Sequence, residues 1–167
     1  MLAQNVNLNG KTVLITGAAG FVGKNLVAQL RNIAEGKNKS YGDVVIEDIF
    51  EYDIDSTVED LDKYCSDCDF VFNLAGVNRP QNQEDFMKGN FGFASVLLDT
   101  LKKYGNHCPV MISSSIQAEL DNPYGRSKRQ AEEALLAFAD KVTIVRSNYC
   151  DMVRILKEKG ITGVDGI

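Results

Sequence analysis

Tyr124 and Lys128 lie four residues apart, just after Asn122-Pro123. Asparagine followed by proline is typical of a helix start, so we expect the pair one turn apart on the same helix face. An ammonium beside a phenol stabilises the phenolate, and we therefore expect Lys128 to lower the pKa of Tyr124 from about 10 toward neutrality. Tyr124 could then exchange a proton near physiological pH. Ser115, the third of three serines at the end of an expected strand, could hydrogen-bond the same substrate oxygen.

A second constellation is the glycine series in the segment KTVLITGAAGFVGKNLVAQL, residues 11–30. An apolar strand precedes the glycines and an amphipathic helix follows them. Gly17 allows a sharp turn, Gly20 lets the backbone approach a pyrophosphate, and Gly23 lets the helix pack closely on the sheet. The helix N-terminus would face the phosphates. The alternative is a glycine-rich turn without a ligand. We expect a dinucleotide to contact Gly17, Gly20, Phe21, Val22 and Gly23.

These residues need a sheet edge to hold them. The apolar and β-branched runs predict strands at 12–16, 44–52, 69–74, 110–113 and 142–145, with an interruption of the second near Glu47 and Asp48. Helical patterns lie between them, one with a capping box from Ser56 to Glu59 and one from 83 to 104 that carries Asn90 in its apolar stripe. Strands alternating with helices predict an α/β fold with a doubly wound parallel sheet.

Composition narrows the classes of function. The chain has 167 residues, 44% of them hydrophobic and 25% charged, which fits one globular domain. A net charge of −5 argues against nucleic acid or an anionic membrane as the main partner. We expect no signal peptide, no membrane span and a cytoplasmic location.

The four cysteines are expected to be reduced thiols. Cys65 and Cys68 have the spacing of half a zinc site, and His107-Cys108 could complete it. No second pair with this spacing is present, so we favour the interpretation that the first two cysteines close a helix, and we expect no metal.

Several of these strings together resemble a known family. TGAAGFVG, NLAG, the serine run and Tyr124-x-x-x-Lys128 are similar to the extended short-chain dehydrogenase/reductase family of nucleotide-sugar epimerases, dehydratases and reductases. AGVNRP (75–80) and SSSIQA with DNPYG.SK (113–128) more closely resemble the reductase half of the CapF-type enzymes of capsular polysaccharide synthesis. The resemblance covers about residues 11–146. It implies a Rossmann-like fold and the reduction of a 4-keto UDP-sugar with a nicotinamide cofactor.

The resemblance also implies residue roles. Tyr124 would be the acid/base, Lys128 its activator and a ribose ligand, and Ser115 would polarise the keto oxygen. Asn90 would support the site from its helix. Leu74, Ala75 and Gly76 would lie along the cofactor.

Two departures from the family limit this expectation. Arg146 is followed by Ser-Asn where the family usually has an Arg-x-Pro-Asn segment, and the sequence ends at Ile167, before the substrate-binding region of the relatives. We therefore assign 1–146 to an NAD(P)-binding domain and 147–167 to a diverged or truncated tail. The alternatives to a nucleotide-sugar reductase are a cofactor-binding module without turnover and a nucleotide-sugar epimerase. A homodimer is compatible with the sequence, which does not reveal the oligomeric state.

Cofactor choice depends on Asp53 at the end of the second strand. An acid there would hydrogen-bond a ribose 2′-hydroxyl and repel a 2′-phosphate, which favours NAD. Asp53 lies 30 residues beyond Gly23, further than the usual spacing, so a solvated loop residue is the alternative. The reductases that the chain resembles tend to use NADPH and carry an arginine next, where this chain has Ile54. On balance the resemblance gives a weak preference for NADPH over NADH.

Overall fold

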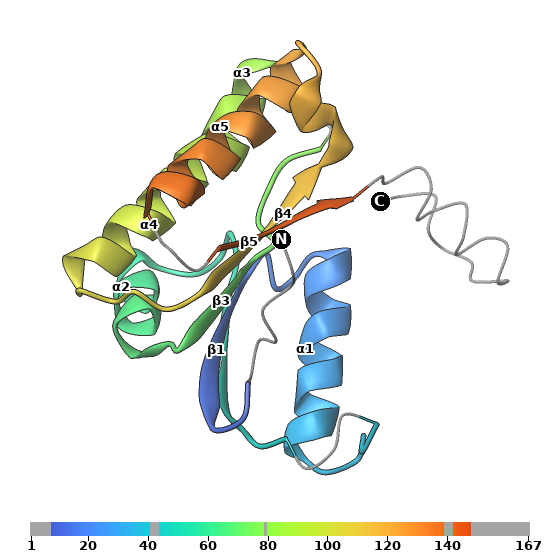
Figure 1. The fold of residues 1–167 in the computed structure, drawn as a ribbon, viewed down its shortest axis with the longest axis vertical. Helices are drawn as coiled ribbons and strands as arrows, with labels where there is room; N and C mark the ends of the chain where they lie inside the picture. The colour runs from blue at the N-terminus through green and yellow to red at the C-terminus, as the bar shows by residue number, and fades with distance from the viewer. Residues whose placement is uncertain (1–7, 41–43, 79, 139–141, 148–167) are drawn as a thin grey trace, which may run out of the picture.

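A single parallel sheet forms the centre of the computed structural model, which describes residues 8–40, 44–78, 80–138 and 142–147. The strand order is β2-β1-β3-β4-β5, and every pairing is parallel. This confirms the predicted α/β fold (Figure 1). In chain order the elements are β1 (Lys11–Thr16), α1 (Phe21–Ala34), β2 (Ile46–Tyr52), α2 (Val58–Asp67), β3 (Phe70–Asn73), α3 (Glu84–Phe86), the π-helix η1 (Met87–Gly92), α4 (Phe93–Lys103), β4 (Val110–Ser115), the 3-10 helix η2 (Ile116–Glu119), α5 (Pro123–Phe138) and β5 (Val142–Ser147).

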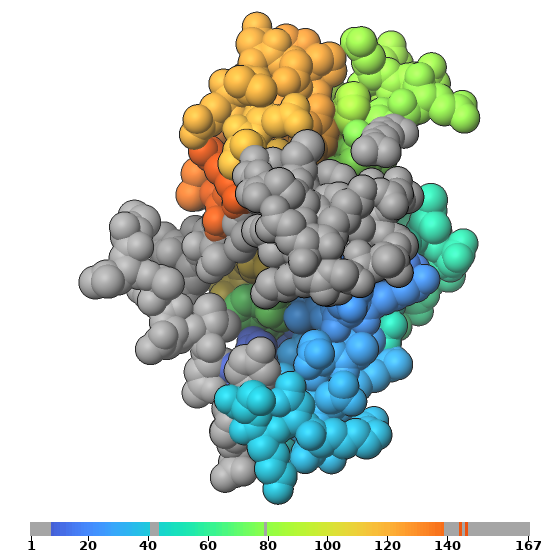
Figure 2. All heavy atoms as spheres, turned by 90° about the vertical axis from the view of Figure 1, so that its right-hand side faces the viewer, coloured from blue at the N-terminus to red at the C-terminus, as the bar shows by residue number. Residues whose placement is uncertain are grey.

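The central strand β1 divides the apolar core into two layers. Val13 and Ile15 pack in one cluster with residues of α1, whereas Leu14 packs in the other with residues of α2, α4 and α5. Successive side chains of a strand point to opposite faces, so one apolar run supplies both layers. Figure 1 shows α1 on one side of the sheet and α2, α4 and α5 on the other. In the space-filling view, η2 and the start of α5 lie at the opposite end of the face from α1 (Figure 2).

The expected interruption of the second strand is a bulge. Lys11 pairs with Ile46 and Thr12 pairs with Asp48, so Glu47 is an extra residue in β2. The bulge leaves the rest of β2 in register with β1, up to the pairing of Thr16 with Tyr52. The ends of β1 and β2 therefore reach the same edge of the sheet.

The predicted capping box is wrong by one residue. Thr57, not Ser56, caps α2: its Oγ1 accepts from the Asp60 backbone N–H, and the Asp60 carboxylate accepts from the Thr57 N–H. Ser56 instead accepts from the Asp53 backbone N–H, which commits its hydroxyl to the turn after β2. The helix also runs on to Asp67 rather than ending near Tyr64.

The helix predicted from 83 to 104 is divided into α3, η1 and α4. A π-helical segment, Met87–Gly92, separates the two α-helical parts. Gly89 lies within it, where a Cβ would stand 2.3 Å from Cγ2 of Val77. Gly105, at a φ of 62°, ends α4 as expected, and the Asn106 N–H donates to the Leu101 carbonyl at 2.9 Å.

The cysteines lie at the edge of the sheet where β3 and β4 begin. Cys65, Cys68 and Cys108 are free and buried, and the sulfurs of the last two are 3.9 Å apart. Cys68 is the residue that closes α2, as predicted. Within the described ranges, no group of three or more metal-ligating side chains is present. No helix in that part of the chain is long and apolar enough to cross a membrane.

The predicted tail lies almost entirely outside the described residues. Ser147 ends β5, which is longer than the strand predicted at 142–145. The assignment of 147–167 to a separate tail therefore stays a prediction.

Candidate functional site

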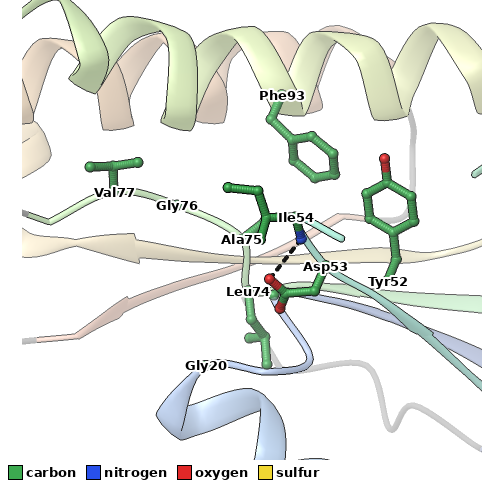
Figure 3. Close-up of a pocket in the computed structure, with 10 residues that line it drawn as sticks. Gly20, Tyr52, Asp53, Ile54, Leu74, Ala75, Gly76, Val77 and Phe93 are labelled. Carbon is green, nitrogen blue, oxygen red and sulfur yellow. Dashed lines mark hydrogen bonds between the residues drawn. The ribbon is translucent and has the colours of Figure 1, made fainter. Parts of the chain in front are cut away.

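A pocket of about 350 Å³ lies where β1, β2 and β3 reach their C-terminal ends. In parallel α/β sheets this edge is the usual place for a ligand. Figure 3 shows the loop that follows β3 on one side of the pocket and the turn before α1 below it. The lining residues are Gly17, Gly20, Tyr52, Asp53, Ile54, Leu74, Ala75, Gly76, Val77 and Phe93.

The three glycines differ in what a side chain would meet. Gly17 has a φ of 71°, and its Cβ would stand 2.7 Å from the Ala75 backbone nitrogen. A Cβ on Gly23 would be 2.1 Å from the Gly17 carbonyl oxygen, so the close packing expected there is confirmed. At Gly20 the nearest atom is that same oxygen, at 3.2 Å. Gly20 therefore tolerates a Cβ more readily than its two companions, and it lines the open pocket.

The first residues of α1 lie outside this lining. Phe21 and Val22 open the helix and are exposed, 40% and 47% respectively. Their predicted contact with a cofactor is untested and stays a prediction.

Asp53 is fixed in the pocket wall rather than free in a loop. One carboxylate oxygen accepts from the Ala19 N–H of the glycine turn at 2.7 Å, and the other accepts from the Ile54 N–H at 2.8 Å. The backbone N–H of Asp53 donates to Ser56. The structure thus places the acid beside the glycine turn despite the long spacing from Gly23. Its role in cofactor choice stays a prediction.

Asn90 holds the loop after β3 by both ends of its amide. Its Oδ1 accepts from the Val77 N–H at 2.9 Å, and its Nδ2 donates to the Val77 carbonyl at 3.2 Å and to Ser127 Oγ at 3.0 Å. The buried amide is therefore fully partnered. Gly76 has no room for a side chain beside it, since a Cβ would be 2.7 Å from Asn90 Oδ1 and 3.0 Å from Lys128 Nζ.

The expected group of Ser115, Tyr124 and Lys128 comes together at the end of β4 and the start of α5. Asn122 Oδ1 accepts from the Gly125 N–H at 2.7 Å and caps the helix as predicted. Gly125, in the first turn of α5, packs directly against protein backbone. A Cβ there would be 2.2 Å from the Gln117 carbonyl oxygen of η2.

The pKa of Tyr124 moves opposite to the expectation. Burial raises it, and a hydrogen bond with Ser115 only partly offsets the effect. The Lys128 ammonium donates to the Ser113 carbonyl at 3.2 Å and lies 5.8 Å from the centre of the Tyr124 ring. Burial lowers the pKa of Lys128 to about 8, with Glu132 acting in the other direction. The expected lowering of the phenol pKa is wrong because burial of Tyr124 dominates, while the Lys128 ammonium donates to the Ser113 carbonyl rather than to the phenol.

Two contacts of Tyr124 were not foreseen. Its hydroxyl donates to Asn78 Oδ1 at 3.2 Å, and its ring packs against Phe86 with the ring centres 5.4 Å apart. Asn78 belongs to the AGVNRP string that the sequence singled out, yet nothing in the sequence gave its distance from Tyr124. The loop after β3 thus reaches both the pocket and the phenol.

The sequence pattern of the NAD dependent epimerase/dehydratase family matches residues 13–151. The chain belongs to this family. It is 39% identical over 130 residues to UDP-2-acetamido-2,6-beta-L-arabino-hexul-4-ose reductase of Pseudomonas aeruginosa. These 130 residues are 78% of this chain and 32% of that enzyme. A stretch of 37 residues is 57% identical to ribosomal RNA small subunit methyltransferase H of Lachnospira eligens, but it covers only 12% of that protein.

Two solved structures are similar to this chain over most of its length and over only part of their own length. The capsular polysaccharide assembling protein CapF from Staphylococcus aureus is 37% identical with a TM-score of 0.61, over 80% of this chain and 34% of that one. The structure of MoeE5 in complex with UDP-glucose and NAD is 26% identical with a TM-score of 0.61, over 81% and 53%. The chain thus spans about a third of the reductase and of CapF.

Proposed function

We propose that this chain is the cofactor-binding and proton-transferring half of an NAD(P)-dependent nucleotide-sugar oxidoreductase that reduces a 4-keto UDP-sugar. The observation that carries the proposal is the arrangement of Ser115, Tyr124 and Lys128 beside a pocket that contains the glycine turn. A nicotinamide cofactor would supply hydride to the sugar carbonyl carbon. The family and the reductase relative support this reaction class.

Each side chain has a role that its position supports. The Tyr124 hydroxyl, whose raised pKa keeps it protonated at neutral pH, would donate a proton to the keto oxygen. Ser115 would hydrogen-bond the same oxygen as its charge develops. Lys128 would act beside Tyr124 and bind the ribose. Gly17, Gly20 and the loop of residues 74–76, which line the pocket, would hold the dinucleotide, and Gly23 would keep α1 close to the glycine turn.

The reading as a reductase has two rivals. An epimerase would use the same three side chains to oxidise and then re-reduce a sugar. A binding module without turnover would use the pocket alone. The identity with a UDP-hexulose reductase favours reduction over epimerisation. We also propose a role in capsular or surface polysaccharide synthesis in the cytoplasm, which the similarity to the capsular polysaccharide assembling protein CapF supports.

Cofactor choice is the finer part of the proposal. The resemblance gives a weak preference for NADPH. The position of Asp53 argues for NADH, since its carboxylate lies at the glycine turn and none of the ten lining residues is basic. MoeE5, whose structure contains NAD, supports a nicotinamide dinucleotide as the cofactor.

Calorimetric titration of the chain with NADH and with NADPH tests the proposal. We expect heat of binding with at least one of them. Asp53→Ala should shift the ratio of the two affinities toward NADPH, and an unchanged ratio would show that Asp53 is not the selector. Absence of binding with both cofactors would refute the proposed function.

A further inference from the structure

One face of α5 meets three consecutive serines of β4. Residues four apart on a helix share a face, so this face continues one turn beyond the candidate site. The residues on this face pair as Tyr124 with Ser115, Lys128 with the Ser113 carbonyl, and Glu132 with Ser114 Oγ. Tyr124 and Lys128 belong to the candidate site, but Glu132 has no part in the proposed chemistry.

Glu132 is a buried carboxylate with a complete set of partners. It is 4% exposed, and Arg146 of β5 donates to both of its oxygens, from Nε at 2.9 Å and from Nη2 at 2.6 Å. The same guanidinium donates to Glu119 of η2 at 2.8 Å. A buried charge is costly unless it is paired and hydrogen-bonded, so these contacts decide whether Glu132 is ionised.

The balance of these effects leaves Glu132 negative. Burial by itself raises its pKa, but hydrogen bonds from Arg146 and Ser114 and the charges of Arg146 and Lys128 outweigh burial, and the pKa is lowered. One turn away, burial lowers the pKa of Lys128 and the charge of Glu132 raises it. Glu132 thus opposes the effect of burial on a lysine that is 7% exposed.

We propose that Glu132 is a positioning residue for Lys128, held by Arg146 and Ser114 so that its negative charge keeps the Lys128 amine protonated. The ammonium donates to the Ser113 carbonyl, and a neutral amine would hold that contact more weakly. The proposal rests on the proposed function only for what Lys128 does to a cofactor. The charge relation between the two side chains stands without it.

Other charged groups on the elements packed against α5 leave this relation intact. Arg146 lies beyond Glu132 and reaches it directly, and Glu119 is bound to the far side of that guanidinium. Asn90 of η1 and the serines of β4 are neutral. The causes of the Lys128 shift are burial and Glu132. They do not include the remaining charged residues of α3, η1 and α4, which are Glu84, Asp85, Lys88, Asp99, Lys102 and Lys103.

The test is a direct titration of Lys128 in the whole ligand-free chain. Lysine side chains labelled with ¹³C at Cε are followed by NMR from pH 6 to 11, and Lys128→Arg assigns the resonance. We expect a pKa of about 8 in the parent chain and a value lower by at least about one unit in Glu132→Gln. Glu133→Gln, which removes an exposed neighbouring charge, is the matched control and should leave the value unchanged.

The direction separates a charge effect from a loss of structure. A variant that merely loosened α5 would expose Lys128 and move its pKa up toward 10.5, so a rise or no change in Glu132→Gln overturns the proposal. Glu132→Met is the second variant and covers the case in which Glu132→Gln does not fold. It removes the same charge without placing a buried amide beside Ser114, and it should also lower the Lys128 pKa. A rise or no change in that variant also overturns the proposal.

A second measurement relates the proposal to the cofactor. The affinity for NADH is measured as a function of pH in the parent and in Glu132→Gln. If Lys128 binds the cofactor as an ammonium, affinity should fall above pH 8 in the parent and at a lower pH in the variant. Absence of cofactor binding in both proteins, together with the expected shift of the Lys128 pKa, would refute the proposed function and leave the role of Glu132 standing.

Discussion

At the scale of single residues, the site depends on two properties: the room for a side chain at its glycines, and the hydrogen-bond and charge partners of its buried polar side chains. Gly23 and Gly125 have backbone oxygens about 2 Å from where a Cβ would be. Lys128 is the opposite case, a long cationic side chain buried beside a carbonyl and a carboxylate. Such positions can favour function at the expense of stability.

Gly20 and Gly23 should separate binding from folding. Gly20→Val places a β-branched side chain in the pocket, where only the Gly17 carbonyl is near, so we expect cofactor binding to be lost with little change in stability. Gly23→Ala puts a methyl group against the Gly17 carbonyl and should destabilise the chain by about 1–3 kcal/mol. Urea unfolding and calorimetry measure the two properties. A Gly20→Val chain that binds the cofactor as well as the parent would refute the expected pyrophosphate contact.

Lys128 should lower stability at neutral pH. Its pKa falls from 10.5 to about 8 on folding. The folded state therefore binds fewer protons than the unfolded state between these values, so stability is lost as the pH falls from 10.5 to 8. The shift corresponds to about 3 kcal/mol, from which the pairing with Glu132 must be subtracted when the lysine is removed.

The corresponding variant is Lys128→Met. We expect it to be more stable than the parent by about 1–3 kcal/mol at pH 7, with the difference vanishing above pH 10.5. Urea unfolding at several pH values measures it, and Lys102→Met, at an exposed position, is the control. A difference that does not depend on pH would contradict the assigned titration.

At the scale of elements, the π-helix η1 matters because it presents Asn90 to the loop after β3. The apolar pattern predicted a continuous helix there, since the residues on either side keep a helical period. The apolar pattern does not reveal a π-helical turn, because such a turn adds one residue while the segment remains helical. The same limit applies to the capping box, where Ser56 and Thr57 both had an acid three residues later and tertiary contacts decided between them.

Asn90→Leu tests the clamp that the Asn90 side chain forms with the Val77 backbone N–H and carbonyl. The substitution leaves the Val77 N–H and carbonyl without their side-chain partner, which should cost about 1–3 kcal/mol. Cofactor affinity should fall with it because the Gly76–Val77 segment lines the pocket. Lys88→Leu, at an exposed position of the same π-helix, is the control for both measurements. Unchanged affinity in Asn90→Leu would mean that the loop keeps its shape without the clamp.

Much of the site could be predicted because it depends on local sequence. The glycine turn, the loop at residues 74–76 and the Tyr124–Lys128 pair each belong to one segment, and the parallel sheet brings their ends to one edge. What could not be predicted depends on contacts between segments. The direction of the Tyr124 pKa shift depends on the burial of the ring, and the partners of Glu132 depend on the position of Arg146 on the next strand, β5.

At the scale of the whole molecule, one sheet and the helix α5 packed against it carry every side chain in the proposed chemistry. The chain nevertheless spans about a third of the reductase and of CapF. In an enzyme of this kind, contacts to the remote parts of the substrate position the reacting carbon over the cofactor. Good orientation can contribute about 7–11 kcal/mol of the barrier.

We therefore predict cofactor binding with little or no turnover for residues 1–167 alone. The chain is incubated with NADPH or NADH and a 4-keto UDP-sugar, and absorbance at the nicotinamide band is followed, with Tyr124→Phe as the blank. We expect little turnover because the substrate carbon would not be held over the cofactor, although Ser115, Tyr124 and Lys128 are all present. Multiple turnovers that vanish in Tyr124→Phe would show that this length of chain is sufficient.

The buried cysteines offer a way to follow partial opening of the fold. Cys65, Cys68 and Cys108 lie where β3 and β4 begin, whereas the pocket lies where β1, β2 and β3 end. Burial raises the pKa of Cys65 to about 12, so its thiol is both enclosed and protonated at neutral pH. Alkylation of these thiols must wait for a fluctuation that exposes them. A bound ligand slows such labelling only if that fluctuation also destroys the binding site, by a factor that grows with ligand concentration. Alkylation kinetics therefore report whether the two edges of the sheet open together or separately.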